Sequence, residues 1–184
     1  AGTFIMAAAM SGGSLTVRDI IPHHLDALFD VIRQTGVGID VGDNFVTVTA
    51  DGRYKAQNVE TQAYPGFPTD LQAQFTAMMC LANGVSQISE TIFENRFMHV
   101  PELVRMGADI SVDGRTAVIR GKEALLPAPV MATDLRASVS LVLAGLATAG
   151  TTRVSHIYHL DRGYAELEAK LGACGARLRR IHKS

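Results

Sequence analysis

Three stretches of the chain consist almost entirely of hydrophobic and small residues, at positions 3–11, 70–83 and 134–149. Within the body of these stretches, only Arg136 carries a full charge. A helix that is apolar on every side is normally buried, because no face of it favours contact with water. The pattern therefore predicts three helices at the centre of the fold.

Each of these stretches is followed by the same succession of patterns. A run with β-branched residues, typical of a strand, comes first; a helix with charges on one face follows; a further strand closes the set. The runs lie at residues 14–18, 85–89 and 151–155, the second helices at 23–35, 98–106 and 164–171, and the closing strands at 44–48, 116–120 and 176–180. Connectors at 53–68 and 121–132 lead into the second and third buried helices, with extended segments around Val59 and at 130–132.

Six glycines punctuate this succession at regular distances. They fall in pairs 23, 23 and 25 residues apart: Gly13 and Gly36, Gly84 and Gly107, Gly150 and Gly175. A glycine after a helix supplies the left-handed backbone that ends it, and the regular spacing indicates internal repetition. We therefore predict one α/β (α+β) domain over residues 1–184, with units at approximately 1–52, 53–120 and 121–184, the apolar helices buried and the sheets outside.

The composition narrows the range of functions. The net charge of −1 lacks the basic excess that a nucleic-acid surface needs. No apolar run reaches the ~20 residues that cross a membrane, and no signal peptide is visible. We therefore expect no nucleic-acid or membrane partner and, with only two cysteines, a cytoplasmic location. Because the chain reads directly from Ala1 into a helix without an initiator Met, we expect it to be a piece of a longer protein.

A repeated pentapeptide places an acid at the start of two buried helices. Residues 69–73 return with one change as residues 133–137. Asp70 and Asp134 either cap their helices or take part in chemistry, and capping is favoured for Asp134. Arg136 needs an acidic partner within the fold or an anionic ligand, because an unpaired buried charge is costly.

The segment at residues 91–99 mixes charged, aromatic and apolar side chains after a predicted strand. It is either a ligand-binding loop or a surface turn with an ordinary ion pair. Arg96 in this segment, Arg136 and Arg162 fall at corresponding edges of the predicted units. They could converge on one polyanion, since arginine favours bidentate contacts with carboxylate and phosphate.

The sequence predicts no metal site. His23 and His24 lack a carboxylate or cysteine at ligand spacing, and Cys80 and Cys174 form no ligand pair. Cys80 lies among methionine and leucine, which indicates a buried and unreactive thiol. The chain contains no glycine-rich phosphate loop, dinucleotide fingerprint or nucleophile elbow.

Four longer motifs, at residues 67–75, 90–103, 131–138 and 157–164, carry a specific resemblance. From residue 1 to about residue 181, the chain resembles the C-terminal part of the UDP-N-acetylglucosamine enolpyruvyl transferases. These are the carboxyvinyltransferases of peptidoglycan synthesis, within the EPSP synthase-like family. Relatives that act on shikimate phosphate share the architecture, but the four motifs are more similar to those of the UDP-sugar enzymes.

The resemblance implies an inside-out α/β barrel fold in two domains, each built from three βαβαββ-like units, and this chain would be one domain. The family moves the enolpyruvyl group of phosphoenolpyruvate to the 3-hydroxyl of UDP-N-acetylglucosamine, and phosphate leaves by addition and elimination. No metal or organic cofactor is implied. The other domain supplies a mobile loop with a reactive cysteine, a lysine, an arginine and most uridine contacts, so this chain alone is expected to be inactive.

The resemblance also implies roles for single residues. Asp70 matches the acid that removes the proton of the sugar hydroxyl, and Arg162 matches an arginine that holds phosphoenolpyruvate. The other expected substrate contacts are Thr69, Ile92 and Phe93 around the aminosugar, with Arg96 and Arg136 as further active-site arginines. Glu94, as a second acid–base group, and Asp134 are additional candidates.

Two other functions stay open. An enolpyruvyl transferase of the same fold could use another acceptor alcohol, such as shikimate phosphate. Alternatively, the chain could be a non-catalytic module that binds a nucleotide sugar or packs against a partner.

Overall fold

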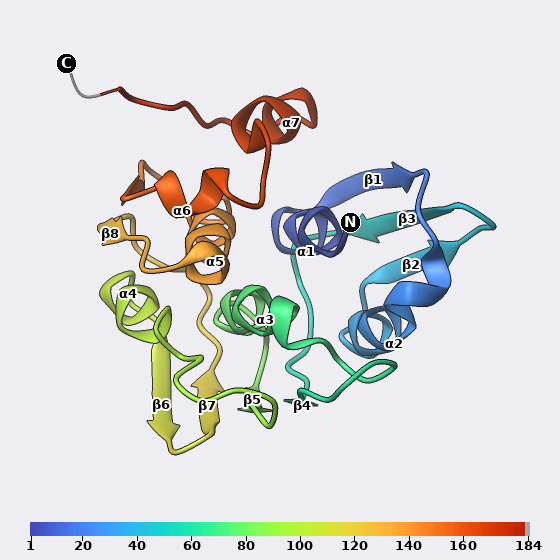
Figure 1. Ribbon diagram of the computed structural model, residues 1–184, viewed down its shortest axis with the longest axis horizontal. Coiled ribbons are helices and arrows are strands. Elements are labelled where there is room, and N and C mark those ends of the chain that lie inside the picture. Colours follow the sequence, from blue (N-terminus) through green and yellow to red (C-terminus); the bar gives the residue numbers. More distant parts are fainter. Residues whose placement is uncertain (183–184) are drawn as a thin grey trace.

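Three buried helices lie at the centre of the computed structural model, which describes residues 1–182. They are α1 (Gly2–Ser11), α3 (Gln72–Met79) and α5 (Leu135–Leu146). They contact one another, and Figure 1 shows them end-on in the middle of the molecule. Every residue of α3 is buried. The prediction that the three apolar stretches form central helices is therefore confirmed.

An antiparallel sheet of three strands covers one side of this centre, on the right in Figure 1. Its order is β1 (Gly13–Arg18), β3 (Phe45–Ala50) and β2 (Gly38–Val41). Val46 and Val48 alternate along β3 as its fully buried residues, and α1 packs against this strand. A 3-10 turn, η1 (Pro22–Leu25), leads into α2 (Asp26–Gln34), which buries Leu28, Phe29 and Ile32.

A second sheet of four strands lies at the bottom of Figure 1. Its order is β4 (Val59–Glu60), β5 (Val85–Ser89), β7 (Thr116–Arg120) and β6 (Asp109–Asp113). The β4–β5 pair is parallel and the other two pairs are antiparallel. Residues Ser86 and Ile88 of β5 are buried, because alternate side chains of a strand point to one face. The helix α4 (Val100–Arg105) packs against β6.

The third region is smaller than predicted. It contains the parallel pair β8 (Pro129–Met131) and β9 (Arg153–Ser155), followed by α6 (Tyr158–Asp161) and α7 (Leu167–Ala173). The strand predicted at residues 176–180 does not form, and no strand within residues 1–182 pairs with this segment. Instead, the Arg180 guanidinium binds Asp161 and Glu168. The last two residues of the predicted third unit lie outside the described part of the chain.

Three separate sheets therefore surround the central helices, and residues 1–182 form no closed barrel. The predicted glycine caps are present after the second helix of each set. Gly36, Gly107 and Gly175 each follow such a helix by two residues and have φ values of 94°, 93° and 97°. Only glycine adopts such left-handed backbone without strain, so these positions fix where the three helices end. No helix in the described residues is long and apolar enough to span a bilayer.

Candidate active site

Asp70 and Arg136, 66 positions apart in the chain, meet at the starts of two central helices. Asp70 lies in the 3-10 turn η2 (Thr69–Leu71), directly before α3. The Nη2 and Nε atoms of Arg136 both donate to Oδ1 of Asp70, at 2.6 and 2.9 Å. The Asp70 side chain is 70% exposed and caps neither η2 nor α3. Within residues 1–182 its Oδ2 accepts no hydrogen bond from another side chain, so one oxygen faces solvent.

Asp134, the counterpart of Asp70 in the repeated pentapeptide, has a different role in the fold. It is the N-cap of α5, and its Oδ1 accepts a hydrogen bond from the backbone N–H of Ala137 at 2.8 Å. This contact satisfies one of the free donors at the start of the helix. The structure therefore bears out capping for Asp134, and Asp70 is the acid that stays accessible.

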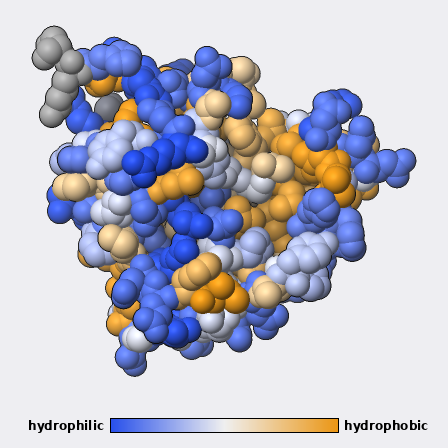
Figure 2. All heavy atoms as spheres, viewed as in Figure 1, coloured by the Kyte–Doolittle hydropathy of each residue, from blue (hydrophilic) through white to orange (hydrophobic). Residues whose placement is uncertain are grey.

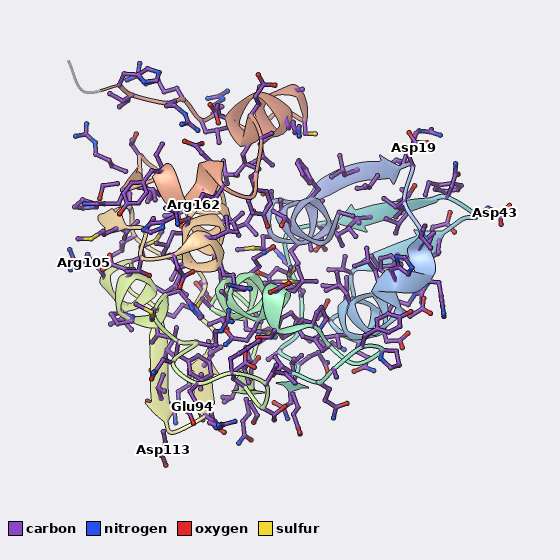
Figure 3. The ribbon with its side chains drawn as sticks, in the orientation of Figure 1. Asp19, Asp43, Glu94, Arg105, Asp113 and Arg162 are labelled. Carbon is purple, nitrogen blue, oxygen red and sulfur yellow. The ribbon has the colours of Figure 1, made fainter. Side chains whose placement is uncertain are left out.

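Arg162 lies at the end of α6, where its side chain is exposed and forms no ion pair within the described residues. Its chain neighbours place it close to the other two candidates. The next residue, Gly163, lies against the side chain of Leu135 at the start of α5: a Cβ atom placed on it would lie 2.7 Å from Cδ2 of Leu135. Figure 3 shows Arg162 beside α5 and α6.

A polar junction joins these segments behind the candidate site. The Thr3 hydroxyl donates to Oε1 of Gln74 at 2.8 Å and lies 2.8 Å from the Tyr164 hydroxyl. The Gln74 amide in turn lies 3.5 Å from the backbone oxygen of Asp70. The junction therefore connects α1, the start of α3 and the turn that follows Arg162.

The loop between β5 and α4 divides into two parts. Ile92 and Phe93 are 39% and 46% exposed, and Cζ of Arg96 lies 4.2 Å from the centre of the Phe93 ring, which is a cation–π contact. Glu94 instead forms an exposed ion pair of 3.2 Å with Arg115. Figure 3 shows Glu94 near the β6–β7 turn, away from Arg162. The ordinary ion pair expected as one alternative for this segment is thus present at Glu94.

One residue that the sequence analysis did not single out is central to the hydrogen bonding here. Glu90, directly after β5, is 1% exposed. The hydroxyls of Thr61 and Thr69 each donate to its carboxylate at 2.6 Å. Burial acts to raise the pKa of Glu90, but these hydroxyls and the backbone N–H groups of Ile92 and Phe93 outweigh it, so the pKa lies below its usual value.

Two other titratable groups are buried nearby or in the core. His99, at the start of α4, is fully enclosed, and burial lowers its pKa to about 4. Burial raises the pKa of the Cys80 thiol to about 12, which confirms the prediction of a buried thiol in its protonated, unreactive form. His23 contacts the Asp26 carboxylate at 2.6 Å, a partner the sequence analysis did not identify, but no third metal-ligating group joins them within residues 1–182.

Asp70, Ile92, Phe93 and Arg162 are exposed rather than enclosed in a pocket. Figure 2 shows strongly hydrophilic atoms at the centre of the face that holds the ends of α3 and α5, with hydrophobic atoms beside them. A cavity of about 950 Å³ lies elsewhere, between α5, β9 and residues 177–181, and includes none of Asp70, Arg136 or Arg162. An accessible carboxylate beside guanidinium groups can accept a proton from a hydroxyl and hold an anionic reactant.

Comparison with known proteins identifies the family. The family model described as EPSP synthase (3-phosphoshikimate 1-carboxyvinyltransferase) matches residues 1–171. The chain belongs to the EPSP synthase family. Within this family, a UDP-N-acetylglucosamine 1-carboxyvinyltransferase from Geobacter metallireducens is 56% identical over 181 residues, which cover 98% of this chain and 43% of the relative. The chain thus spans less than half the length of the curated relatives that it matches.

Two solved structures are similar to this chain in fold. The enolpyruvyl transferase NikO from Streptomyces tendae matches with a TM-score of 0.86 and 30% identity, over 97% of this chain and 42% of that one. An EPSP synthase from Acinetobacter baumannii matches with a TM-score of 0.66 and 19% identity, over 83% of this chain and 37% of that one. The second likeness shows the fold alone, and together they establish a mixed helix-and-strand fold of the enolpyruvyl transferase type.

Proposed function

We propose that this chain is one half of a UDP-N-acetylglucosamine 1-carboxyvinyltransferase, which moves the enolpyruvyl group of phosphoenolpyruvate to the 3-hydroxyl of UDP-N-acetylglucosamine. The observation that carries the proposal is the 56% identity to such an enzyme across 98% of the chain. The solved EPSP synthase is only 19% identical. The UDP-sugar is therefore favoured over shikimate phosphate as the acceptor.

We further propose that residues 1–184 are a single domain built from three related units, as in an inside-out α/β barrel. Two observations support this arrangement. The three central helices contact one another, and each unit ends its second helix at a glycine with positive φ. Within residues 1–182 the third unit has no closing strand.

In this reaction Asp70 would be the general base. Its Oδ2 is accessible, while Oδ1 is held by Arg136, so the orientation of the carboxylate is fixed before substrate binds. A sugar hydroxyl is a far weaker acid than a carboxylic acid of pKa ~3.9, so the proton should move as the hydroxyl oxygen bonds to C2 of phosphoenolpyruvate. C3 gains a proton in this addition and loses one when phosphate leaves.

The arginines would balance the negative charge of phosphoenolpyruvate and of the tetrahedral intermediate. Arg136 and Arg162 flank the start of α5, and Arg96 lies over Phe93 in the neighbouring loop. Fixed guanidinium donors of this kind stabilise charge that develops in a transition state. Thr69, Ile92 and Phe93 would contact the aminosugar, whereas Glu94, paired with Arg115, is less well placed for acid–base chemistry.

The other half of the site would come from a second domain. Asp70, Ile92, Phe93 and Arg162 are exposed, and the chain covers 43% of its relative. We therefore expect the isolated chain to release no phosphate from phosphoenolpyruvate. If calorimetry showed tight binding of UDP-N-acetylglucosamine by the isolated chain, a non-catalytic binding module would be favoured instead.

The acceptor is tested by measuring phosphate release by the full-length protein that contains this chain. We expect release from phosphoenolpyruvate with UDP-N-acetylglucosamine and little with shikimate 3-phosphate. Release with shikimate 3-phosphate alone would show that the acceptor is wrong while the reaction class is right. An absence of release with either acceptor would contradict the proposed activity.

A further inference from the structure

A buried carboxylate without a cation beside it lies just under the candidate site. Glu90 is 1% exposed, yet no lysine, arginine or histidine within residues 1–182 forms an ion pair with it. An ionised carboxylate in this position is costly unless hydrogen bonds replace its lost hydration. The groups around Glu90 must therefore supply hydrogen-bond donors, which an apolar side chain of the same size would not need.

Four donors surround the two oxygens of this carboxylate. Oε1 accepts from the Thr69 hydroxyl at 2.6 Å and from the Gln72 amide at 3.5 Å. Oε2 accepts from the Thr61 hydroxyl at 2.6 Å and from the backbone N–H of Ile92 at 3.2 Å. The two hydroxyl bonds have the short length that a charged acceptor favours, whereas the contacts from Gln72 and Ile92 are longer and therefore weaker.

The four groups belong to three segments, which the backbone also joins: the N–H of Thr61 donates to the oxygen of Ser89, and the N–H of Gln62 donates to the oxygen of Phe67. Thr69 is followed at once by Asp70 and the start of α3. Ile92 begins the exposed apolar part of the β5–α4 loop, and the Gln72 amide also donates to the backbone oxygen of Arg96 at 3.2 Å. Thr61 lies at the end of β4, and its hydroxyl oxygen accepts from the backbone N–H of Thr91 at 2.9 Å. Glu90 is therefore the side chain at which hydrogen bonds from the Asp70 turn and from the Ile92–Phe93 loop meet.

We propose that Glu90 is a positioning residue, whose buried carboxylate fixes the acceptor-sugar side of the site by joining Thr69 and Asp70 to Ile92 and Phe93. This inference rests on the proposed function for the identity of the acceptor. The arginine side of the site has anchors of its own, because Arg136 lies in the first turn of α5, which Asp134 caps, and the turn after Arg162 contacts Thr3 and Leu135. Loss of Glu90 should consequently affect the sugar more than phosphoenolpyruvate.

A glutamine at this position has nearly the same shape but cannot accept all four hydrogen bonds. If its amide nitrogen replaced Oε2, it would face the N–H of Ile92, which can only donate. If the nitrogen replaced Oε1, it would face the amide nitrogen of Gln72. Either orientation leaves a buried donor without its partner, so the loop or the Asp70 turn must move.

The first test is steady-state kinetics of the full-length protein with Glu90→Gln. We expect KM for UDP-N-acetylglucosamine to rise tenfold or more, while KM for phosphoenolpyruvate changes less than twofold. Glu60→Gln is the matched control, since Glu60 is exposed on the adjacent strand β4, and should behave like wild type. Equal rises in both KM values, or a folded variant with both unchanged, would overturn the inference.

A second pair of variants removes the dependence on one substitution. Thr61→Val deletes a donor to Glu90 and should raise KM for the sugar selectively. Thr61→Ser keeps the hydroxyl, so its KM for the sugar should stay at the wild-type value. If Thr61→Val acted only by destabilising the whole protein, the difference between the valine and serine variants would not be confined to KM for the sugar. If Thr61→Val and Thr61→Ser give the same sugar KM, Glu90 does not position the site through Thr61, and the inference fails.

Hydrogen exchange separates failure of this inference from failure of the proposed function. Glu90→Gln should speed amide exchange in the peptide covering residues 91–97 at least tenfold, and Glu60→Gln should not. If the wild-type protein shows no turnover but Glu90→Gln still speeds exchange in residues 91–97, the proposed reaction is refuted. Glu90 is then retained as the residue that orders the loop. Wild-type turnover with unchanged exchange in Glu90→Gln would refute the inference alone.

Discussion

Arg136 binds Asp70 through only one carboxylate oxygen, and this asymmetry leaves the other oxygen free for a substrate. The sequence indicated that Arg136 needed either an acidic partner or an anionic ligand, but it could not select the acid. The partner lies 66 residues away, so the pairing depends on how α3 and α5 pack. Exposed pairs of this kind add about 0–1 kcal/mol to stability, so orientation of Asp70 is the more important consequence.

Glu90 could have been found from the sequence, although it was not. Ser86 and Ile88 of β5 are both buried, and the period of two along a strand puts Glu90 on the same face. An acid that continues the inward face of a strand must find hydrogen-bond donors. Which donors these are could not be predicted, because Thr61 follows a strand of only two residues and Thr69 begins a short 3-10 turn, and neither element has a hydrophobic period that places it beside β5.

His99 gives a prediction on pH. Its pKa is lowered by burial to about 4, with Asp134 acting weakly in the opposite direction, and the value in an unfolded chain is near 6.5. As pH falls from 6.5 towards 4, the unfolded state takes up a proton that the folded state does not, so stability falls with pH in that range. Between pH 7 and pH 5 this group should cost about 2 kcal/mol.

The measurement is urea unfolding of wild type and His99→Leu at both pH values. The variant should lose less unfolding free energy between pH 7 and pH 5 than wild type, by about that amount. Other titrating groups are common to both proteins and cancel in the difference. Equal losses in the two proteins would show that His99 is protonated in the folded state.

At the scale of elements, hydrophobic patterning located the central helices and the strands that bury a face. It missed β2 and β6, which bury no residue and form by pairing with β3 and β7 at sheet edges, whereas β1 and β9, which also bury none, were predicted from their β-branched residues. Asp113-Gly114 between β6 and β7 was an available hairpin signal. The helix predicted from residue 164 begins instead at Leu167, since Tyr164 turns towards Thr3 and Glu166 has a φ of 52°.

The polar junction between elements gives a prediction on stability. Thr3→Val removes the hydroxyl that lies between Gln74 and Tyr164, which leaves their polar groups without this partner in a buried position. We expect the free energy of unfolding to fall by about 1–3 kcal/mol. Chemical denaturation of the two proteins measures this change.

Thr148→Val is the matched control for that experiment. Thr148 is also a buried threonine near a central helix, but its hydroxyl donates only to the backbone oxygen of Ala144, which lies four residues before it. Removal of this local bond should cost less than removal of the junction. An equal or smaller loss for Thr3→Val would mean that the junction does not hold the three segments together.

At the scale of the whole molecule, candidate groups from three segments lie along one edge of the central helices. Asp70 precedes α3, Arg136 begins α5, and Arg162 ends α6, beside the start of α5. The pattern of repeated units predicted corresponding edges for Arg136 and Arg162, and the resemblance to a family added Asp70 to them. The chain covers 43% of its relative, so these groups are proposed as one wall of a site that a second domain completes.

The most direct test of this account compares phosphate release by the full-length protein carrying Asp70→Asn with that of wild type. Asparagine keeps the size of the side chain and an oxygen for Arg136 but cannot take up the proton of the acceptor hydroxyl. We predict that kcat falls roughly 10²–10⁴-fold while the unfolding transition stays in place, and that Asp113→Asn, in the exposed β6–β7 turn, keeps the wild-type rate. Turnover by Asp70→Asn within a few fold of wild type would contradict the central claim that this chain supplies the base.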